Sequence, residues 1–340
     1  MKCPTSMNVT AQQSGAAWHI YNGDCCEVLK GIPSGSIGFT IFSPPFASLY
    51  TYSNSERDLG NCRSDDMFME HFRFVVSELY RVTKPGRLVS FHCMNLPSSK
   101  ERDGVIGLKD FRGDLVWMFR RAGWIFHSEV CIWKDPVIAM QRTKALGLLH
   151  KQIVKDSCMS RQGIPDYLVT MRKPGVNPDR VDGEFDKFVG DLTPEEFELA
   201  LKQKYHTRSS HPAAQDSRSM GFETFLSVNI WQKYASPIWM DIDPGRTLQR
   251  DSARDQKDER HICPLQLDVI ERAMILWSKP GDVVLSPFAG IGSEGYIAVK
   301  EGRKFIGIEL KESYYNQACL NMKAAEDKQY EMLSLVESKP

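Results

Sequence analysis

The chain has 340 residues, enough for one large α/β domain or for a core domain with a smaller insertion. Its composition, 42% hydrophobic and 25% charged, is ordinary for a globular protein, and no apolar run reaches the roughly 18 residues that span a bilayer. The formal net charge is zero, so a polyanionic partner would have to be met by a local basic patch.

Residues 1–15 lack the apolar segment of a signal peptide, and we expect a flexible tail there. From 16 to 136, strand and helix signals alternate. In chain order we expect a strand running into a turn over 17–25, a strand over 36–42, a helix over 67–83, a strand over 88–93, a helix over 111–124 and a strand over 125–134. This alternation is typical of a mostly parallel sheet with helices on both faces.

The stretch 137–258 is polar, loop-rich and broken by proline and glycine, which favours an insertion into the sheet. Between Lys134 and Arg180, nine Lys or Arg stand against four Asp or Glu, a local excess of five positive charges. The α/β pattern returns over 259–330, and 331–340 is predicted to be a second tail. The elements expected there are a helix over 265–278, a strand over 283–288, a glycine loop, a helix over 296–302, a strand over 304–310 and a last helix from about 311.

The nine cysteines show no Cys-x-x-Cys spacing. This favours reduced thiols in a cytoplasmic protein over a disulfide framework or a zinc site, and we predict no bound metal.

The glycine loop near the C-terminus follows a strand that ends at Pro287 and Phe288. Gly290 and Gly292 let the backbone approach a ligand, and the next helix begins with free N–H groups. The following strand ends in Glu309, where a carboxylate can accept from ribose hydroxyls. The pattern predicts an adenosine-containing ligand, with a tight turn and a solvated glutamate as the alternative. No G-x-G-x-x-G or G-K-[ST] motif is present, so the dinucleotide and P-loop classes are not supported.

A second motif, SPPF, follows the strand at 36–42. Its two prolines have no backbone N–H and stiffen the chain. The segment is either a rigid turn or a row of acceptors that faces a hydrogen-bond donor.

The motif SPPF follows one strand, SPFAGIG follows another, and GIE ends the strand after that. Taken together, these motifs resemble the amino-methyltransferases of DNA. Their patterns are [DSN]PP[YFW] and DPFxGxGT followed by a strand ending in an acidic residue. Matches in the same order include GDCCEVLKGIPSGSIGFTIFSPPF, ELYRVTKPGRLVSFH, AGWIFHSEVCIWKDP and HICPLQLDVIERAMILWSKPGD. The tetrapeptide precedes the cofactor loop with the basic insertion between them, as in the β-class of the family. Ser286 departs from the family's Asp, and Ser293 and Glu294 after the second glycine also depart from its pattern.

The resemblance implies a Rossmann-like S-adenosylmethionine-dependent methyltransferase fold with permuted motif order and a loop-rich basic insertion. It implies methyl transfer to an exocyclic amine of a base flipped out of double-stranded DNA. Ser43 Oγ and the Pro44 carbonyl would accept from the amine, and Phe46 would stack on the base. The catalytic set is Ser43, Pro44, Pro45 and Phe46, and the cofactor set is Asp24, Ser286, Pro287, Phe288, Gly290, Gly292 and Glu309.

The implied DNA contacts are aromatic rings after the tetrapeptide and basic side chains of the insertion, which would act as a target recognition region. Each is alternatively a packed loop ring or a solvated surface charge. The set is Tyr50, Tyr52, Arg142, Lys144, Lys151, Lys155, Arg172 and Lys173.

Serine in the first position of SPPF favours cytosine N4 as the target, with adenine N6 as the alternative. Two other functions stay open. One is a DNA-binding protein with a degenerate methyltransferase fold, suggested by Ser286, Ser293 and Glu294; the other is a Rossmann-like enzyme acting on small molecules. The chain contains no nuclease motif, so a cognate nuclease would be a separate protein. A monomer or a homodimer fits the sequence equally, and a bacterial or phage origin is expected.

Overall fold

The computed structural model describes residues 9–46, 59–62, 64–98, 100–138, 150–160, 162–182, 222–249 and 264–337, together with the isolated helical positions 195, 198, 199 and 202. In that described part of the chain, no helix combines the length and apolarity that a bilayer crossing requires.

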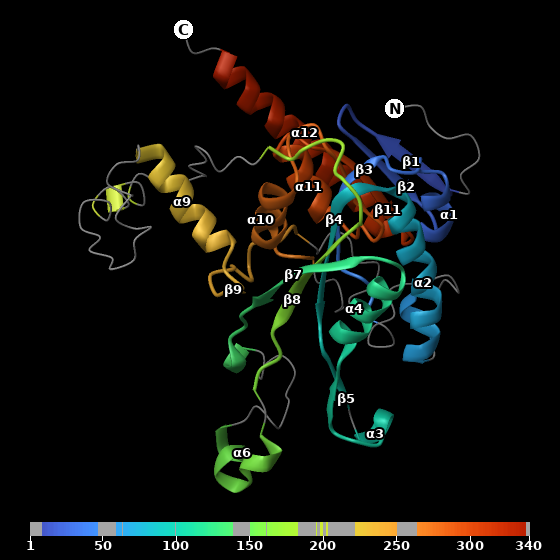
Figure 1. The fold of residues 1–340 in the computed structure, drawn as a ribbon, viewed down its shortest axis with the longest axis vertical. Coiled ribbons are helices and arrows are strands. Elements are labelled where there is room, and N and C mark those ends of the chain that lie inside the picture. Colours follow the sequence, from blue (N-terminus) through green and yellow to red (C-terminus); the bar gives the residue numbers. More distant parts are fainter. Residues whose placement is uncertain are drawn as a thin grey trace.

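A nine-stranded mixed sheet in the order β1-β2-β11-β10-β3-β4-β8-β7-β9 forms the centre of the molecule (Figure 1). β2, β11, β10, β3 and β4 run parallel to one another, and β8 runs antiparallel to both of its neighbours. The strands are β1 (Ala11–Ser14), β2 (Trp18–Asn22), β3 (Ile37–Phe42), β4 (Thr83–Met94), β7 (Ile125–Ile132), β8 (Asp166–Arg172), β9 (Ile238–Trp239), β10 (Val283–Ser286) and β11 (Lys304–Glu309). The predicted fold class, a mostly parallel sheet in an α/β protein, is confirmed.

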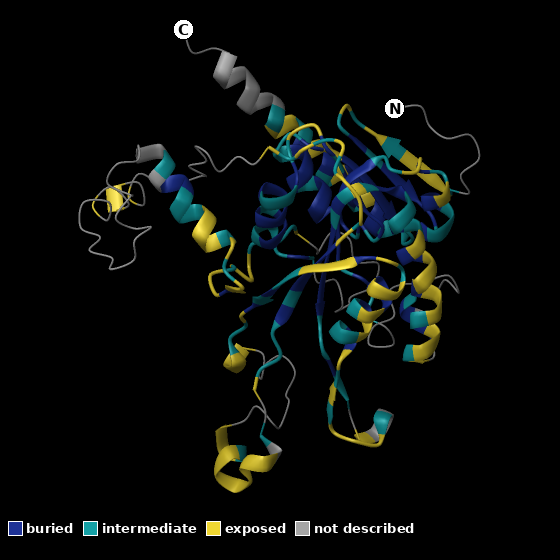
Figure 2. Cartoon of the chain, viewed as in Figure 1, coloured by how far each residue is buried: buried dark blue, intermediate teal, exposed yellow. Residues whose placement is uncertain are grey.

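Helices pack on both faces of this sheet and bury two separate apolar clusters. Neighbouring strand residues point to opposite faces, so Leu285 lies in one cluster and Val284 in the other. One face carries α1 (Cys25–Lys30), α2 (Asp65–Val82) and α4 (Phe111–Arg121), and the other carries α10 (Leu267–Trp277), α11 (Ser293–Lys300) and α12 (Glu312–Glu337). Figure 2 shows the buried residues concentrated in the sheet and in the helices that pack on it.

The longest helix of the first face, α2, illustrates how the sequence sets an element. Ser64 caps its N-terminus and accepts from the backbone N–H of Met67 at 3.2 Å. Phe68, Phe72 and Leu79 recur at helical spacing and are fully buried against the sheet.

Two smaller units extend past the edge at which β4 ends and β8 begins (Figure 1). One is a hairpin of β5 (Leu96–Ser98) and β6 (Gly107–Lys109), with α3 (Lys100–Asp103) between its strands. The other contains α6 (His150–Lys155) and the 3₁₀ turn η4 (Ser157–Met159). The remaining described elements are η2 (Leu59–Asn61) and α9 (Phe222–Tyr234).

Four elements differ from the predicted organisation. β1 lies inside the predicted N-terminal tail and pairs with β2. α12 continues to Glu337, across most of the predicted C-terminal tail. β8 and β9 come from the predicted insertion but belong to the main sheet, because Leu168, Val169 and Met171 are fully buried and pair between β4 and β7. Residues 137–258 therefore contribute core strands as well as loops.

Candidate active site

The loops after β3 and β10 meet where the chain changes direction across the sheet. From β10 the chain crosses through α11 to β11, on one side, whereas from β3 it crosses through α2 to β4, on the other. The two strands are hydrogen-bonded neighbours, with Val284 opposite Phe39. The crevice at such a switch point, beyond the carboxyl ends of the strands, is the usual ligand site of an open α/β sheet.

Aromatic packing fixes the two predicted motifs against each other. Phe42 is the last residue of β3 before Ser43, and its ring centroid lies 5.8 Å from that of Phe288 in the glycine loop. Phe72 of α2 also packs on Phe288, with centroids 6.1 Å apart. The structure thus brings together two motifs from opposite ends of the sequence.

The glycine loop has the conformation that its glycines allow. Gly290 and Gly292 have φ of 54° and 87°, in the left-handed region that favours glycine. A Cβ on Gly290 would meet nothing within 4 Å, so this backbone borders open space. A Cβ on Gly292 would instead lie 3.3 Å from the Cβ of Ala318 on α12.

Glu309 braces the same loop. Its Oε2 accepts from Gly290 N at 2.8 Å and its Oε1 accepts from Lys311 N at 2.9 Å. The carboxylate therefore lies beside the glycine loop, at the end of the adjacent parallel strand. Ser286, at the end of β10, is fully buried, and its Oγ has no hydrogen-bond partner among the described groups.

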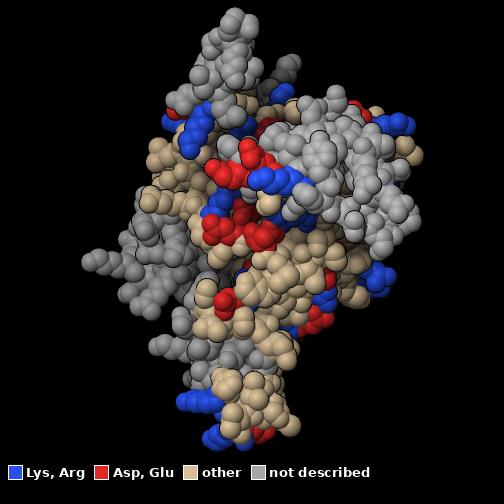
Figure 3. All heavy atoms as spheres, turned by 90° about the vertical axis from the view of Figure 1, so that its left-hand side faces the viewer, with Lys and Arg blue, Asp and Glu red and all other residues tan. Residues whose placement is uncertain are grey.

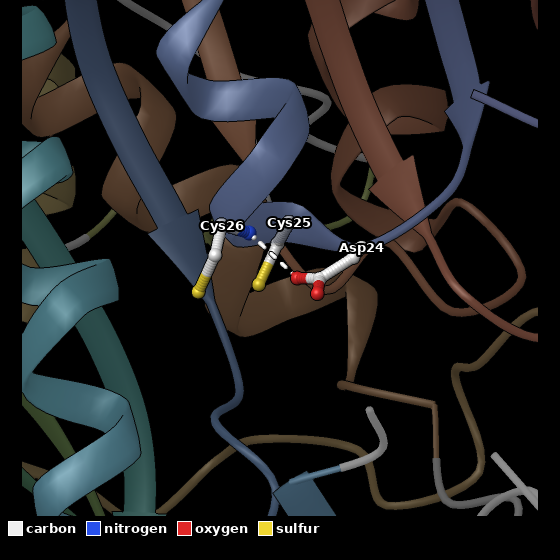
Figure 4. Close-up of side chains that lie close together, drawn as sticks. All are labelled: Asp24, Cys25 and Cys26. Atoms are coloured by element: carbon white, nitrogen blue, oxygen red, sulfur yellow. Dashed lines mark hydrogen bonds between the residues drawn. The ribbon is translucent and has the colours of Figure 1, made fainter. Parts of the chain in front are cut away.

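Asp24 lies at the same edge, after β2, and caps α1. Its Oδ1 accepts from Cys26 N at 2.9 Å, and the neighbouring Gly23 N donates to the Glu309 carbonyl at 3.0 Å. Figure 4 shows the side chains of Asp24, Cys25 and Cys26 close together. A carboxylate oxygen and the two Sγ atoms lie within 4.8 Å of one another. The turn of α1 brings these sequence neighbours together and Asp24 serves as its cap, so the cluster has a structural explanation.

The tetrapeptide leaves β3 with Ser43 half-buried and Pro44 buried. The Phe46 ring lies 6.3 Å from that of Phe111 at the start of α4, so one side of the predicted stacking ring packs on the core. Ser43 Oγ lies 3.2 Å from His92 Nδ1, a partner that the sequence did not indicate.

His92 continues into a buried ion pair. Its Nε2 lies 3.0 Å from Asp166 Oδ2 in a contact that is bent rather than linear, and Lys134 Nζ lies 2.6 Å from Asp166 Oδ1. Burial alone would raise the pKa of Asp166, but the contacts with His92 and Lys134 outweigh it and hold that pKa below its ordinary value. Asp166 pairs with Met94 across β4 and β8, which makes it the diagonal neighbour of His92 on one face.

The predicted DNA contacts separate into three groups. Lys151 and Lys155 are exposed on α6, which extends past the edge that carries Ser43. Arg172 and Lys173 lie at the other end of β8, roughly 20 Å from Asp166 at about 3.3 Å per residue. Lys173 Nζ donates to the Thr83 carbonyl at 2.7 Å. The structure does not bring these two to the candidate site. Tyr50, Tyr52, Arg142 and Lys144 lie outside the described residues.

The charged side chains on one face of the molecule are also unevenly distributed. Figure 3 shows blue Lys and Arg side chains at the lower end of the molecule, where Figure 1 draws α6, and a mixture of acidic and basic side chains across the middle. Among the residues that the structure describes on this face, basic side chains gather at the lower end, beside an acidic one, and do not form a continuous band.

Comparison of the sequence with known proteins finds a matching family and similar relatives. A family model for N6/N4 methyltransferases, described as DNA methylase, matches residues 37–319. The chain is 34% identical over 327 residues to the DNA adenine methyltransferase YhdJ of Escherichia coli K12, covering 94% of this chain and 87% of that protein. It is 24% identical over 304 residues to the Type II methyltransferase M.Cfr9I of Citrobacter freundii, covering 88% and 85%.

Solved structures share the fold at lower identity. A protein of Thermus thermophilus described as a DNA modification methylase, complexed with S-adenosyl-L-methionine, superposes with a TM-score of 0.58 at 21% identity, covering 90% of this chain and 93% of that one. The cytosine-N4-specific PvuII DNA methyltransferase superposes with a TM-score of 0.53 at 15% identity, covering 96% and 97%.

Proposed function

The chain belongs to the N6/N4 DNA methylase family, and we propose that it transfers a methyl group from S-adenosylmethionine to the exocyclic amino group of a base in double-stranded DNA. The observation that carries this proposal is the packing of Phe42 on Phe288 at the switch point of the sheet. It joins the acceptor motif at Ser43 to the glycine loop at Gly290, so that an amine and a cofactor can be held side by side.

The cofactor's end of the site is supported by three features. The backbone at Gly290 borders open space, the Glu309 carboxylate lies beside it, and Ser286 Oγ is a buried polar atom without a partner among the described groups. We propose that Glu309 accepts from the ribose hydroxyls. The proposed cofactor set also includes Asp24, Pro287, Phe288 and Gly292. Bound S-adenosylmethionine would supply an electrophilic methyl group.

The residues of the acceptor motif would orient the amine. Its nitrogen is a poor nucleophile because the lone pair is conjugated with the ring. Acceptors on Ser43 and Pro44 would hold both N–H groups and turn the lone pair toward the methyl group, which is catalysis by positioning and fixed dipoles. Phe46 would contact the flipped base. No covalent adduct with the base is required.

The family covers two target amines, cytosine N4 and adenine N6. Ser43, by the family resemblance, favours cytosine N4, which we propose as the first candidate. The 34% identical relative is named an adenine methyltransferase, which favours adenine N6 as the second.

Incubation of unmodified DNA with labelled S-adenosylmethionine, digestion to nucleosides and mass identification tests the proposal. N4-methylcytosine or N6-methyladenine is expected. Calorimetry with S-adenosylmethionine distinguishes this enzyme from a DNA-binding protein with a degenerate methyltransferase fold. Neither methylated nucleoside, together with no heat of cofactor binding, would refute the proposed function.

Lys151 and Lys155 are proposed to contact DNA phosphates from α6. Reversing both charges (Lys151→Glu with Lys155→Glu) is expected to lower DNA affinity and to reduce the slope of log affinity against log salt by about 2, one for each lost contact. The matched control is Lys304→Glu with Lys323→Glu, an equal charge change at two exposed positions of β11 and α12. Equal loss of affinity in the two double variants would show that only net charge matters.

We also propose a cytoplasmic location for this DNA-directed activity.

A further inference from the structure

Ser43, His92, Asp166 and Lys134 form one continuous chain of polar contacts that leads from the candidate site into the protein. The successive separations are 3.2, 3.0 and 2.6 Å. The four residues come from the ends of β3, β4, β7 and β8, so the fold places them together. His92 and Asp166 are buried, with relative exposures of 8% and 3%.

The contacts determine which nitrogen of His92 carries the proton. Nε2 lies 3.0 Å from an oxygen of the Asp166 carboxylate in a bent contact, and a lone pair on Nε2 would be repelled by that charge. The proton of a neutral His92 therefore lies on Nε2, leaving Nδ1 as an acceptor. Since Nδ1 faces Ser43 Oγ, the serine hydroxyl must donate to it.

The direction of this hydrogen bond decides what the Ser43 hydroxyl can offer to a substrate. A free hydroxyl can donate or accept, and a donating hydroxyl would oppose the N–H groups of an amine. With its proton held by His92, Ser43 Oγ offers only lone pairs to the site. The serine then presents the acceptor character that an aspartate carries through its charge.

We propose that His92, held by Asp166 and Lys134, fixes Ser43 as an acceptor and takes up the proton that the amine loses on methylation. This inference rests on the proposed function. His92, Asp166 and Lys134 are positioning residues that act on the substrate through Ser43.

The transfer conserves atoms and charge. The amine nitrogen forms a bond to the methyl carbon, and the electron pair of the broken carbon–sulfur bond stays on sulfur. The nitrogen, now cationic, passes a proton to Ser43 Oγ while the serine hydroxyl proton moves to His92 Nδ1. The product is the neutral methylated amine, and His92 becomes an imidazolium beside Asp166 until it releases the proton to water.

The surroundings of His92 suit a transient positive charge. Oδ2 of Asp166 on β8 lies beside its Nε2, and Lys134, following β7, contacts the other oxygen of that carboxylate. Two thiols near Asp166 are those of Cys93 and Cys131, and burial raises the pKa of both. They therefore add no charge near neutral pH.

The test is steady-state methylation by the full chain, with unmodified duplex DNA and S-adenosylmethionine as substrates. His92→Gln is expected to lower kcat by about 100-fold, the range of general acid–base contributions, with cofactor and DNA affinities changed less than about threefold. The pH profiles of wild type and His92→Gln should differ, because His92 takes up a proton in the wild type only.

Non-additivity gives the second readout. Ser43→Ala alone and Ser43→Ala with His92→Gln should have the same kcat, because both break the same chain of contacts. The matched control is Ser90→Ala, which removes the buried 2.9 Å contact with Thr170 on the same two strands and should keep wild-type kcat and pH dependence.

Three results would contradict the proposed role of His92. They are wild-type kcat in His92→Gln, an unchanged pH profile in that variant, and additive losses in the double variant. If His92→Gln does not fold, Asp166→Asn provides the same three readouts, with folding checked by circular dichroism. Absence of any methylation by the wild-type chain would refute the proposed function itself, and is thus distinguishable from failure of the proposed role of His92.

Discussion

Replacing Asp282 with alanine is expected to lower the free energy of unfolding by about 3–5 kcal/mol, because it leaves a buried guanidinium without its counter-charge. Arg87 and Asp282 are 2% and 4% exposed and form a direct ion pair. Arg87 Nε also donates to the Gly38 carbonyl at 2.8 Å, and its Nη1 donates to the Asp179 carbonyl at 3.1 Å. The pair therefore joins β4 and β3 of the first half of the chain to the turn before β10 of the second.

Chemical denaturation with urea measures this loss. The control is Glu27→Ala, which breaks the exposed Lys30–Glu27 pair and should cost at most about 1 kcal/mol. Replacing both partners, Arg87→Met with Asp282→Val, should cost less than the sum of the two single changes, since neither charge is left buried alone. Equal effects of Asp282→Ala and Glu27→Ala would contradict the account.

Elements with a strong local signal were predictable from the sequence. The helix expected over 67–83 is α2 (Asp65–Val82), because apolar residues such as Phe68 and Phe72 recur at helical spacing and Ser64 caps it. The strand before SPPF is β3 (Ile37–Phe42), since a run of mostly apolar, strand-forming residues fits a strand buried on both faces.

β8 was missed because its surroundings, not its own residues, were used to assign it. Asp166–Arg172 lies within a stretch broken by proline and glycine, and was interpreted as part of a loop-rich insertion. Its run of strand-forming residues from Leu168 to Met171 was the available signal. Arg172 and Lys173 were assigned to DNA from the charge excess alone, whereas the strand carries them to the edge opposite Ser43.

His92 and Asp166 could not be linked from the sequence. They lie on strands far apart in the chain, and no spacing rule connects them. Only the antiparallel register of β4 and β8, with Met94 opposite Asp166, makes them diagonal neighbours. The family resemblance supplied Ser43 without the partner that gives its hydroxyl a direction.

Glu294 in the first turn of α11 gives the second large prediction: Glu294→Gln should stabilise the protein at pH 8.5 by about 3–5 kcal/mol and have little effect near pH 4.5. The residue is 4% exposed, and burial, reinforced by the charge of Glu309, raises its pKa from 4.5 to about 8. Below pH 4.5 the carboxyl is protonated in both the folded and unfolded states. Between pH 4.5 and 8 only the unfolded state releases the proton, so the stability that Glu294 contributes falls as pH rises and is lost above the folded pKa. Glutamine is neutral and nearly isosteric, so it removes this dependence.

The measurement is the difference in unfolding free energy between Glu294→Gln and wild type from pH 4.5 to 8.5. Glu70→Gln, on the exposed face of α2, is the control and should give the same small difference at both pH values. A pH-independent difference for Glu294→Gln would mean that Glu294 is ionised in the folded protein at neutral pH. The expected result would mean that this family member keeps a neutral acid beside its glycine loop at a cost in stability that rises with pH. Such a cost is typical of functional sites, where stability is given up locally.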